Sequence, residues 1–220
     1  MLGLVLSALL IAFTAAIALW RSERHERRLI AAGFAAHLFG VVAVVLYHER
    51  VYKGGDMFLY RDFGRELARL VERDPRYVGD LVRLALHLDN GLALDMFQGS
   101  SSGTMVAVMT FLVFVLGDSL YPICLAVSLF AFIGQLSMYR AVVGKLEPVE
   151  QKPVLAAFLL MPSVVFWSSG FIKEAFVVGF LGILARAGRG LLDRRAMLLS
   201  VPGLAFGGLG IALMKPYLLF

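Results

Sequence analysis

Apolar runs of near-membrane length recur along the chain, and short polar stretches separate them. Four runs approach the length of about 20 apolar residues that crosses a bilayer: Leu2–Trp20, Leu29–Tyr47, Leu120–Met138 and 196–214. Only helices or closed barrels satisfy their backbone hydrogen bonds in lipid, and the chain lacks the alternating segments typical of barrel strands. The pattern predicts an all-α, polytopic transmembrane helix bundle in which residues 1–220 form a single membrane domain.

A longer apolar run, Pro153–Ala185, cannot be one span. As a helix it would extend about 50 Å, which is too long for one crossing. Pro162 or the stretch Ser168-Ser169-Gly170 would interrupt it. We therefore predict two shorter spans, 153–169 and 171–185, with a turn at residues 171–174.

Residues 50–104 form the one sizeable polar segment, and two amphipathic helices fit within it. The apolar stripe of the first is Phe63, Leu67, Leu70 and Val71, and that of the second is Val78, Leu81, Val82, Ala85 and Leu88. These helices either lie in the membrane interface or pack on one another. The apolar run 105–117 that follows is short, which is typical of a re-entrant or buried segment.

Basic residues set the expected orientation. Four arginines in residues 21–28 follow the first apolar run, and only the chain's own amino group precedes it. Because cytoplasmic flanks carry an excess of Lys and Arg, we expect the N-terminus and residues 50–104 outside, with 11 basic residues inside and 10 outside. If 105–117 spans the membrane fully and the N-terminus is inside, 15 basic residues lie inside and 6 outside. This second topology stays open.

Composition supports the membrane class and excludes others. The chain is 60% hydrophobic and 17% charged, whereas soluble domains carry about a quarter charged residues. The net charge of +5 comes without basic runs interleaved with aromatic residues, so no nucleic acid partner is expected. The single cysteine, Cys124, excludes an intrachain disulfide and is expected to be a packing residue.

The candidate chemistry centres on Gly54-Gly55-Asp56-Met-Phe-Leu-Tyr60-Arg61, just beyond the second apolar run. Asp56 is a candidate catalytic carboxylate with a cation beside it, although Asp is also a favoured helix N-cap. Ionisable residues near membrane segments are candidates for function. Besides Asp56, Tyr60, Arg61 and Asp62, these are Asp118, Lys173, Glu174 and Lys215, all placed outside by the preferred topology.

Three other features allow two interpretations each. His37 lies in a span, where a polar contact between helices is expected more often than a ligand or a proton relay. The loop 98–104 precedes a helix, so it is either a linker or a phosphate contact. Gly203-x-x-x-Gly207 is typical of close helix packing, although ordinary glycine use in membrane helices explains it as well.

Two motifs resemble a known family. One is Asp-x-x-x-Tyr after an early span, here Asp56 and Tyr60, and the other is Pro-Ser-x-x-Phe-Trp-Ser-Ser-Gly-x-x-Lys-Glu, here 162–174. Together they resemble the GT-C superfamily of membrane glycosyltransferases, which includes protein O-mannosyltransferases and the lipid A aminoarabinose transferase. The chain departs from it by an extra first helix, by Met57 where many members have a second acid, and by lacking further C-terminal spans. We expect the chain to be truncated at its C-terminus.

The resemblance implies transfer of a sugar from a polyprenyl phosphate to a lipid, glycan or protein acceptor outside a bacterial plasma membrane. Asp56 would be the general base. Arg61, Lys173 and Lys215 would stabilise the leaving phosphate, and Tyr60 and Glu174 would belong to the same substrate site. Some members use a divalent metal at the acid, and membrane lipid is a further partner.

Three alternatives remain. An enzyme that polymerises or ligates lipid-linked glycans would share the outside site but take a whole oligosaccharide as donor. A transporter would show internal repeats and broken helices at the midplane, whereas the ionisable residues here gather near one surface. A non-catalytic membrane subunit or fragment fits the short chain.

Overall fold

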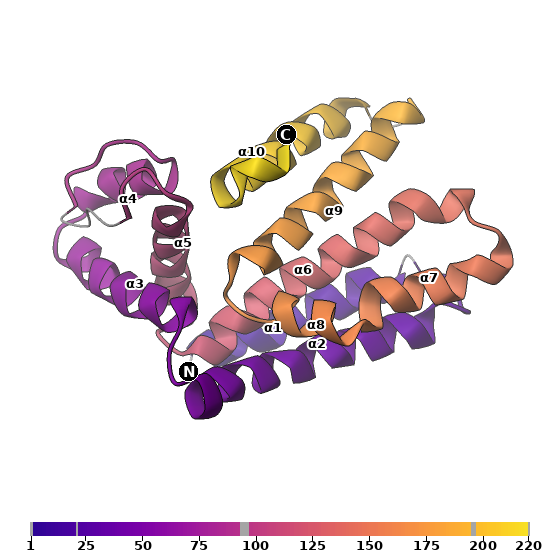
Figure 1. Ribbon diagram of the computed structural model, residues 1–220, viewed down its shortest axis with the longest axis horizontal. Coiled ribbons are helices and arrows are strands. Elements are labelled where there is room, and N and C mark those ends of the chain that lie inside the picture. Colours follow the sequence, from indigo (N-terminus) through magenta and orange to yellow (C-terminus); the bar gives the residue numbers. More distant parts are fainter. Residues whose placement is uncertain (1, 21, 93–96, 195–196, 220) are drawn as a thin grey trace.

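The computed structural model describes residues 2–20, 22–92, 97–194 and 197–219 (Figure 1). Within these ranges the chain is helical and has no strand. The first half contains α1 (Leu2–Trp20), α2 (Arg27–Tyr47), the π-helical turn η1 (His48–Tyr52), α3 (Asp56–Arg73), α4 (Tyr77–Ala85) and α5 (Ser101–Leu116). The second half contains α6 (Leu120–Val142), the 3-10 turn η3 (Val143–Lys145), α7 (Pro148–Leu160), α8 (Pro162–Ser168), α9 (Lys173–Leu192), α10 (Met197–Met214) and η4 (Pro216–Leu219). Arg21, residues 93–96 of the predicted polar segment, and residue 196 of the predicted span 196–214 lie outside the described residues.

Among the described residues, five helices are long and apolar enough to cross a membrane: α1, α2 continued by η1, α6 continued by η3, α9 and α10. Helices α7 and α8 pass the same test as a pair, but they are bent by 42° relative to one another. The all-helical fold class is thus confirmed, and the apolar helices support a membrane protein.

The interruption predicted near Pro162 is present. Met161 has extended backbone angles and Pro162 begins α8, because a residue before proline is disfavoured in the helical region. A second break, residues 169–172, separates α8 from α9. Helix α9 then continues to Leu192, beyond the expected end at residue 185. The apolar run ends at residue 185, but the helix continues beyond it because Arg186 and Arg189 are good helix formers.

Helices α3, α4 and α5 form a group beside the long helices (Figure 1). Both amphipathic helices pack mainly on α5 and barely touch one another, so the alternative in which they pack on one another is not supported. Helix α3 buries Leu67 and Val71 of its predicted stripe. Helix α4 instead buries Leu84 and leaves Val78 and Val82 exposed.

The long helices pack through glycines at their closest contacts. A Cβ atom added to Gly134 of α6 would lie 2.5 Å from the Val178 carbonyl oxygen of α9, and one added to Gly182 would lie 2.3 Å from the Gly134 Cα. Glycine at these positions lets the two backbones approach. Gly203 and Gly207 likewise face α9, so their spacing is a packing pattern rather than ordinary glycine use.

A buried polar network joins α2, α6 and α8. His37 is fully buried; its Nδ1 lies 3.0 Å from the Ser128 hydroxyl and its Nε2 lies 3.1 Å from Gln135 Oε1. Gln135 Nε2 donates to the Ser168 hydroxyl at 3.1 Å, and the Ser128 hydroxyl donates to Ser169. His37 is therefore a polar contact between helices, as predicted, and the network fixes the end of α8 just before Lys173.

Replacing His37 with Ala should destabilise the fold, because Ser128 and Gln135 would lose a buried partner. We expect a loss of about 1–3 kcal/mol in the free energy of unfolding. Denaturation in detergent, followed by circular dichroism, measures it. The matched control is His25→Ala at an exposed position, with an expected change within about 0.5 kcal/mol. Equal stability of the two variants would contradict this prediction.

Candidate active site

An open cleft of about 530 Å³ lies where the end of α2, the start of α3 and the α8–α9 turn meet. Asp56 and Glu174 line it from α3 and α9. The remaining lining residues are Tyr47, His48, Tyr52, Gly55, Met57, Trp167 and Ile172. Predicted site residues from two distant parts of the sequence thus line one hollow.

A tight turn brings Asp56 to the cleft. After η1, Lys53 adopts a left-handed conformation and Gly55 has φ 104°, a region that favours glycine. A Cβ atom at Gly55 would also lie 2.8 Å from the Tyr52 ring. Gly55 is the N-cap of α3 and Asp56 is its first, exposed residue. The interpretation of Asp56 as the N-cap is therefore wrong, although its carboxylate is well placed for the positive end of the helix dipole.

Lys173 places a positive charge beside the start of α5. Its Nζ donates to the Ser101 hydroxyl at 2.8 Å and to the Ser102 hydroxyl at 3.1 Å. Both serines lie in the first turn of α5, which Ser100 caps by accepting from the Gly103 N–H. Among the described residues, the Lys173 ammonium donates hydrogen bonds to neutral hydroxyls, and the Asp56 and Glu174 carboxylates act on it electrostatically. Lys173 thus contributes a positive charge between these carboxylates and the start of α5.

Tyr60 links the acid to this lysine. Its side chain is 2% exposed and its hydroxyl lies 3.3 Å from the Ser102 hydroxyl. Burial raises the pKa of Tyr60, and the negative charge of Asp56 adds to the effect. The phenol therefore stays protonated at neutral pH and can act as a hydrogen-bond donor.

The C-terminal end of the described chain also reaches the site. Lys215 Nζ donates to Glu174 Oε1 at 2.5 Å, and this hydrogen bond raises the pKa of Lys215. Lys215 follows α10, whereas Glu174 lies in the first turn of α9. The ion pair thereby connects the end of α10 to Glu174, one of the residues that line the cleft.

Of the predicted site residues, the structure brings together Asp56, Tyr60, Lys173, Glu174 and Lys215. It does not bring Arg61 to them. Arg61 pairs with Asp62 at 2.9 Å and lies over the Phe58 ring. At about 3.6 residues per turn, Tyr60 shares the helix face of Asp56 and Arg61 does not. The predicted role of Arg61 in phosphate stabilisation is therefore not supported.

Asp118, a further candidate, lies away from this group and pairs with Arg65 at 3.4 Å. Sequence reasoning missed Ser101 and Ser102 as partners of Lys173, although they lie in the loop considered for phosphate. It also missed His48, whose position directly before the Gly-Gly-Asp turn was the available signal.

A divalent metal at Asp56 finds no support from neighbouring ligands. Within the described residues, no group of three or more His, Cys, Asp or Glu side chains is arranged to hold a metal ion. Oxygen-ligand metal sites usually combine several such groups.

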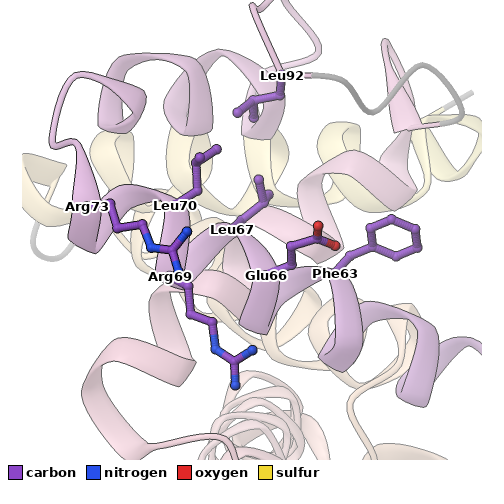
Figure 2. Close-up of a pocket in the computed structure, with 7 residues that line it drawn as sticks. All are labelled: Phe63, Glu66, Leu67, Arg69, Leu70, Arg73 and Leu92. Atoms are coloured by element: carbon purple, nitrogen blue, oxygen red, sulfur yellow. The ribbon is translucent and has the colours of Figure 1, made fainter.

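A separate cavity of about 470 Å³ lies along α3. Figure 2 shows Leu67 and Leu70 reaching toward Leu92, while Arg69 extends away from it. The cavity contains none of the residues gathered around Asp56. We therefore do not assign the candidate chemistry to it.

Comparisons with protein-family models, with curated proteins and with solved structures find no match for this chain. We therefore infer its function from its own residues and their geometry.

Proposed function

We propose that this chain is an integral membrane glycosyltransferase that transfers a sugar from a polyprenyl phosphate to a hydroxyl or amine of an extracytoplasmic acceptor. The observation that supports this best is an acid in the cleft with a cation beside it, since the Asp56 carboxylate and the Lys173 ammonium group act on one another electrostatically. Asp56 presents an exposed carboxylate, and Lys173 presents an ammonium group that is bonded to serines at the start of α5. Inverting sugar transfer from a lipid phosphate needs a base and a cation on opposite sides of the anomeric carbon.

The proposed step uses these groups as follows. The acceptor oxygen attacks the anomeric carbon while Asp56 takes the acceptor's proton. The bond between that carbon and the phosphate oxygen breaks, and the polyprenyl phosphate leaves with the electron pair. Lys173 and the positive end of the α5 helix dipole stabilise the phosphate. Attack from the face opposite the leaving group inverts the anomeric configuration.

The cleft has a suitable wall for the lipid part of the donor. Tyr47 and Trp167 line it and are 41% and 50% exposed. Tyr47 also packs edge-on against Phe166 of α8. Exposed aromatic side chains are favoured at membrane interfaces, where the ring is apolar and its polar end is wet. A polyprenyl chain can pass along this aromatic wall while its phosphate reaches Lys173.

A donor comparison in proteoliposomes tests the function. We expect the full chain to release polyprenyl phosphate from a labelled polyprenyl-phosphate hexose or pentose, and to leave a nucleotide sugar intact. An acceptor mixture from cell-envelope extract supplies hydroxyl and amine groups. Turnover of a diphosphate-linked oligosaccharide alone would favour a glycan polymerase or ligase. No turnover of any of these donors, with correctly folded protein, would contradict the proposal.

A further inference from the structure

A second cleft, of about 510 Å³, opens between α6, α9 and α10. Three arginines contribute to its lining, Arg140, Arg186 and Arg189, together with one carboxylate, Asp193. Along α9, Arg186 lies about 20 Å from Lys173. The cleft is therefore at the other end of the bundle from Asp56 and independent of the function proposed above.

Two of the three arginines lie at the ends of helices long and apolar enough to cross a membrane. Arg140 is in the last turn of α6, and Arg189 is in the last turn of α9. Arg140 donates to the Ala18 carbonyl at 3.2 Å and to the Ser22 hydroxyl at 3.1 Å, and Arg189 pairs with Asp193 at 2.8 Å. These contacts hold two guanidinium groups in place at the cleft. Arg186, one turn deeper, is exposed.

Small and apolar residues complete the cleft. Ser137, Ala187, Gly190 and Gly203 occupy the wall and leave room between the three helices. The surface beside the cleft is apolar. Leu199 lines the cleft and is 75% exposed, and Leu192 nearby is 82% exposed. A basic hollow directly beside exposed leucines suits a ligand with an anionic head and apolar tails.

We propose that this cleft binds the head group of an anionic membrane phospholipid. Guanidinium groups bind phosphate through paired, charge-assisted hydrogen bonds. Basic pockets between membrane helices bind such head groups, and charged side chains within a span usually face the bundle interior or a cavity. A small soluble phosphate would use the arginines equally well, but it would leave Leu192 and Leu199 without a partner. The combination of charge and leucines therefore favours a lipid.

Native mass spectrometry of the purified full chain tests the site, with phosphatidylglycerol and phosphatidylcholine of identical acyl chains as probes. We expect retained phosphatidylglycerol on the wild type and little phosphatidylcholine. Arg186→Gln should weaken phosphatidylglycerol binding about ten-fold, as expected for the loss of one hydrogen bond between charged groups. Binding to Arg186→Lys should fall between that of the wild type and that of Arg186→Gln. The matched control, Arg194→Gln, removes the same charge outside the cleft and should change binding less than about two-fold, because a distant exposed charge is screened.

Three results would overturn the proposal. One is equal weakening by Arg186→Gln and Arg194→Gln, which would indicate a general surface charge effect. Another is equal retention of both lipids by the wild type. The third is displacement of phosphatidylglycerol by inorganic phosphate at equal concentration, which would indicate a site for free anions. The last two use only the wild type, so the proposal stays testable if Arg186→Gln fails to fold.

Discussion

Replacing Asp56 with Asn is expected to lower sugar transfer by about 10²–10⁴-fold, the usual contribution of a positioned general base. The amide keeps the size and shape of the side chain but cannot accept the acceptor's proton. Because Asp56 is exposed and is not the N-cap of α3, its replacement should leave the fold intact. The measurement is release of polyprenyl phosphate in proteoliposomes that contain equal amounts of protein.

Asp62 provides the matched control for this variant. It lies on the same helix, is exposed, and pairs with Arg61 away from the cleft. Asp62→Asn is expected to keep transfer within about two-fold, since an exposed ion pair contributes little. If Asp56→Asn and Asp62→Asn transfer sugar equally well, Asp56 is not the base and the proposed mechanism is wrong.

Replacing Lys173 with Met is expected to lower kcat/KM by about 10²–10³-fold, the range found when one group that stabilises developing charge is removed. Met retains the length and the apolar stem of lysine but not the ammonium group. Lys173→Arg should restore part of the activity, because it returns the charge with a different geometry. Lys145→Met, at an exposed position at the other end of the bundle, is the control.

If Lys173 had a purely structural role, the variants would lose activity in a different order. Its contacts to Ser101 and Ser102 tie α9 to α5. The double variant Ser101→Ala, Ser102→Ala removes these contacts and leaves the charge in place. We expect this variant to keep far more activity than Lys173→Met. If both lose activity in proportion to lost folded protein, Lys173 holds the helices together and does not act on the donor.

Much of the helical framework could be predicted from apolar run length alone. The predicted runs 2–20 and 120–138 correspond to α1 and α6, because the length of hydrocarbon to be crossed sets the length of the run. The break at Pro162 followed from backbone sterics. The ends of helices were less predictable, as α5 shows by starting at Ser101 within the expected loop. Serine occurs both in loops and in the first turn of helices, so the serines of this stretch did not reveal where α5 begins.

The candidate site was only partly predictable. Asp56 and Tyr60 are four residues apart on one helix, and such neighbours meet without help from the rest of the fold. The contact of Lys173 with Ser101 and Ser102 joins residues about 70 positions apart. It depends on how α9 and α5 pack, and no local pattern in the sequence specifies that. Arg61 shows the opposite case. It is close to Asp56 in the sequence and was predicted to share its site, but it lies on another face of the helix and pairs with Asp62.

The ion pair between Glu174 and Lys215 has a consequence for biosynthesis. A ribosome that adds about 5–20 residues per second makes Asp56 several seconds before Lys173, and Lys215 later still. Helices α3 and α4 both pack on α5, and the three can assemble during that interval. A nascent chain that has reached this point holds the acid without its cation. The Lys173 cation comes beside Asp56 only when α9 has been inserted, and Lys215 pairs with Glu174 only after α10.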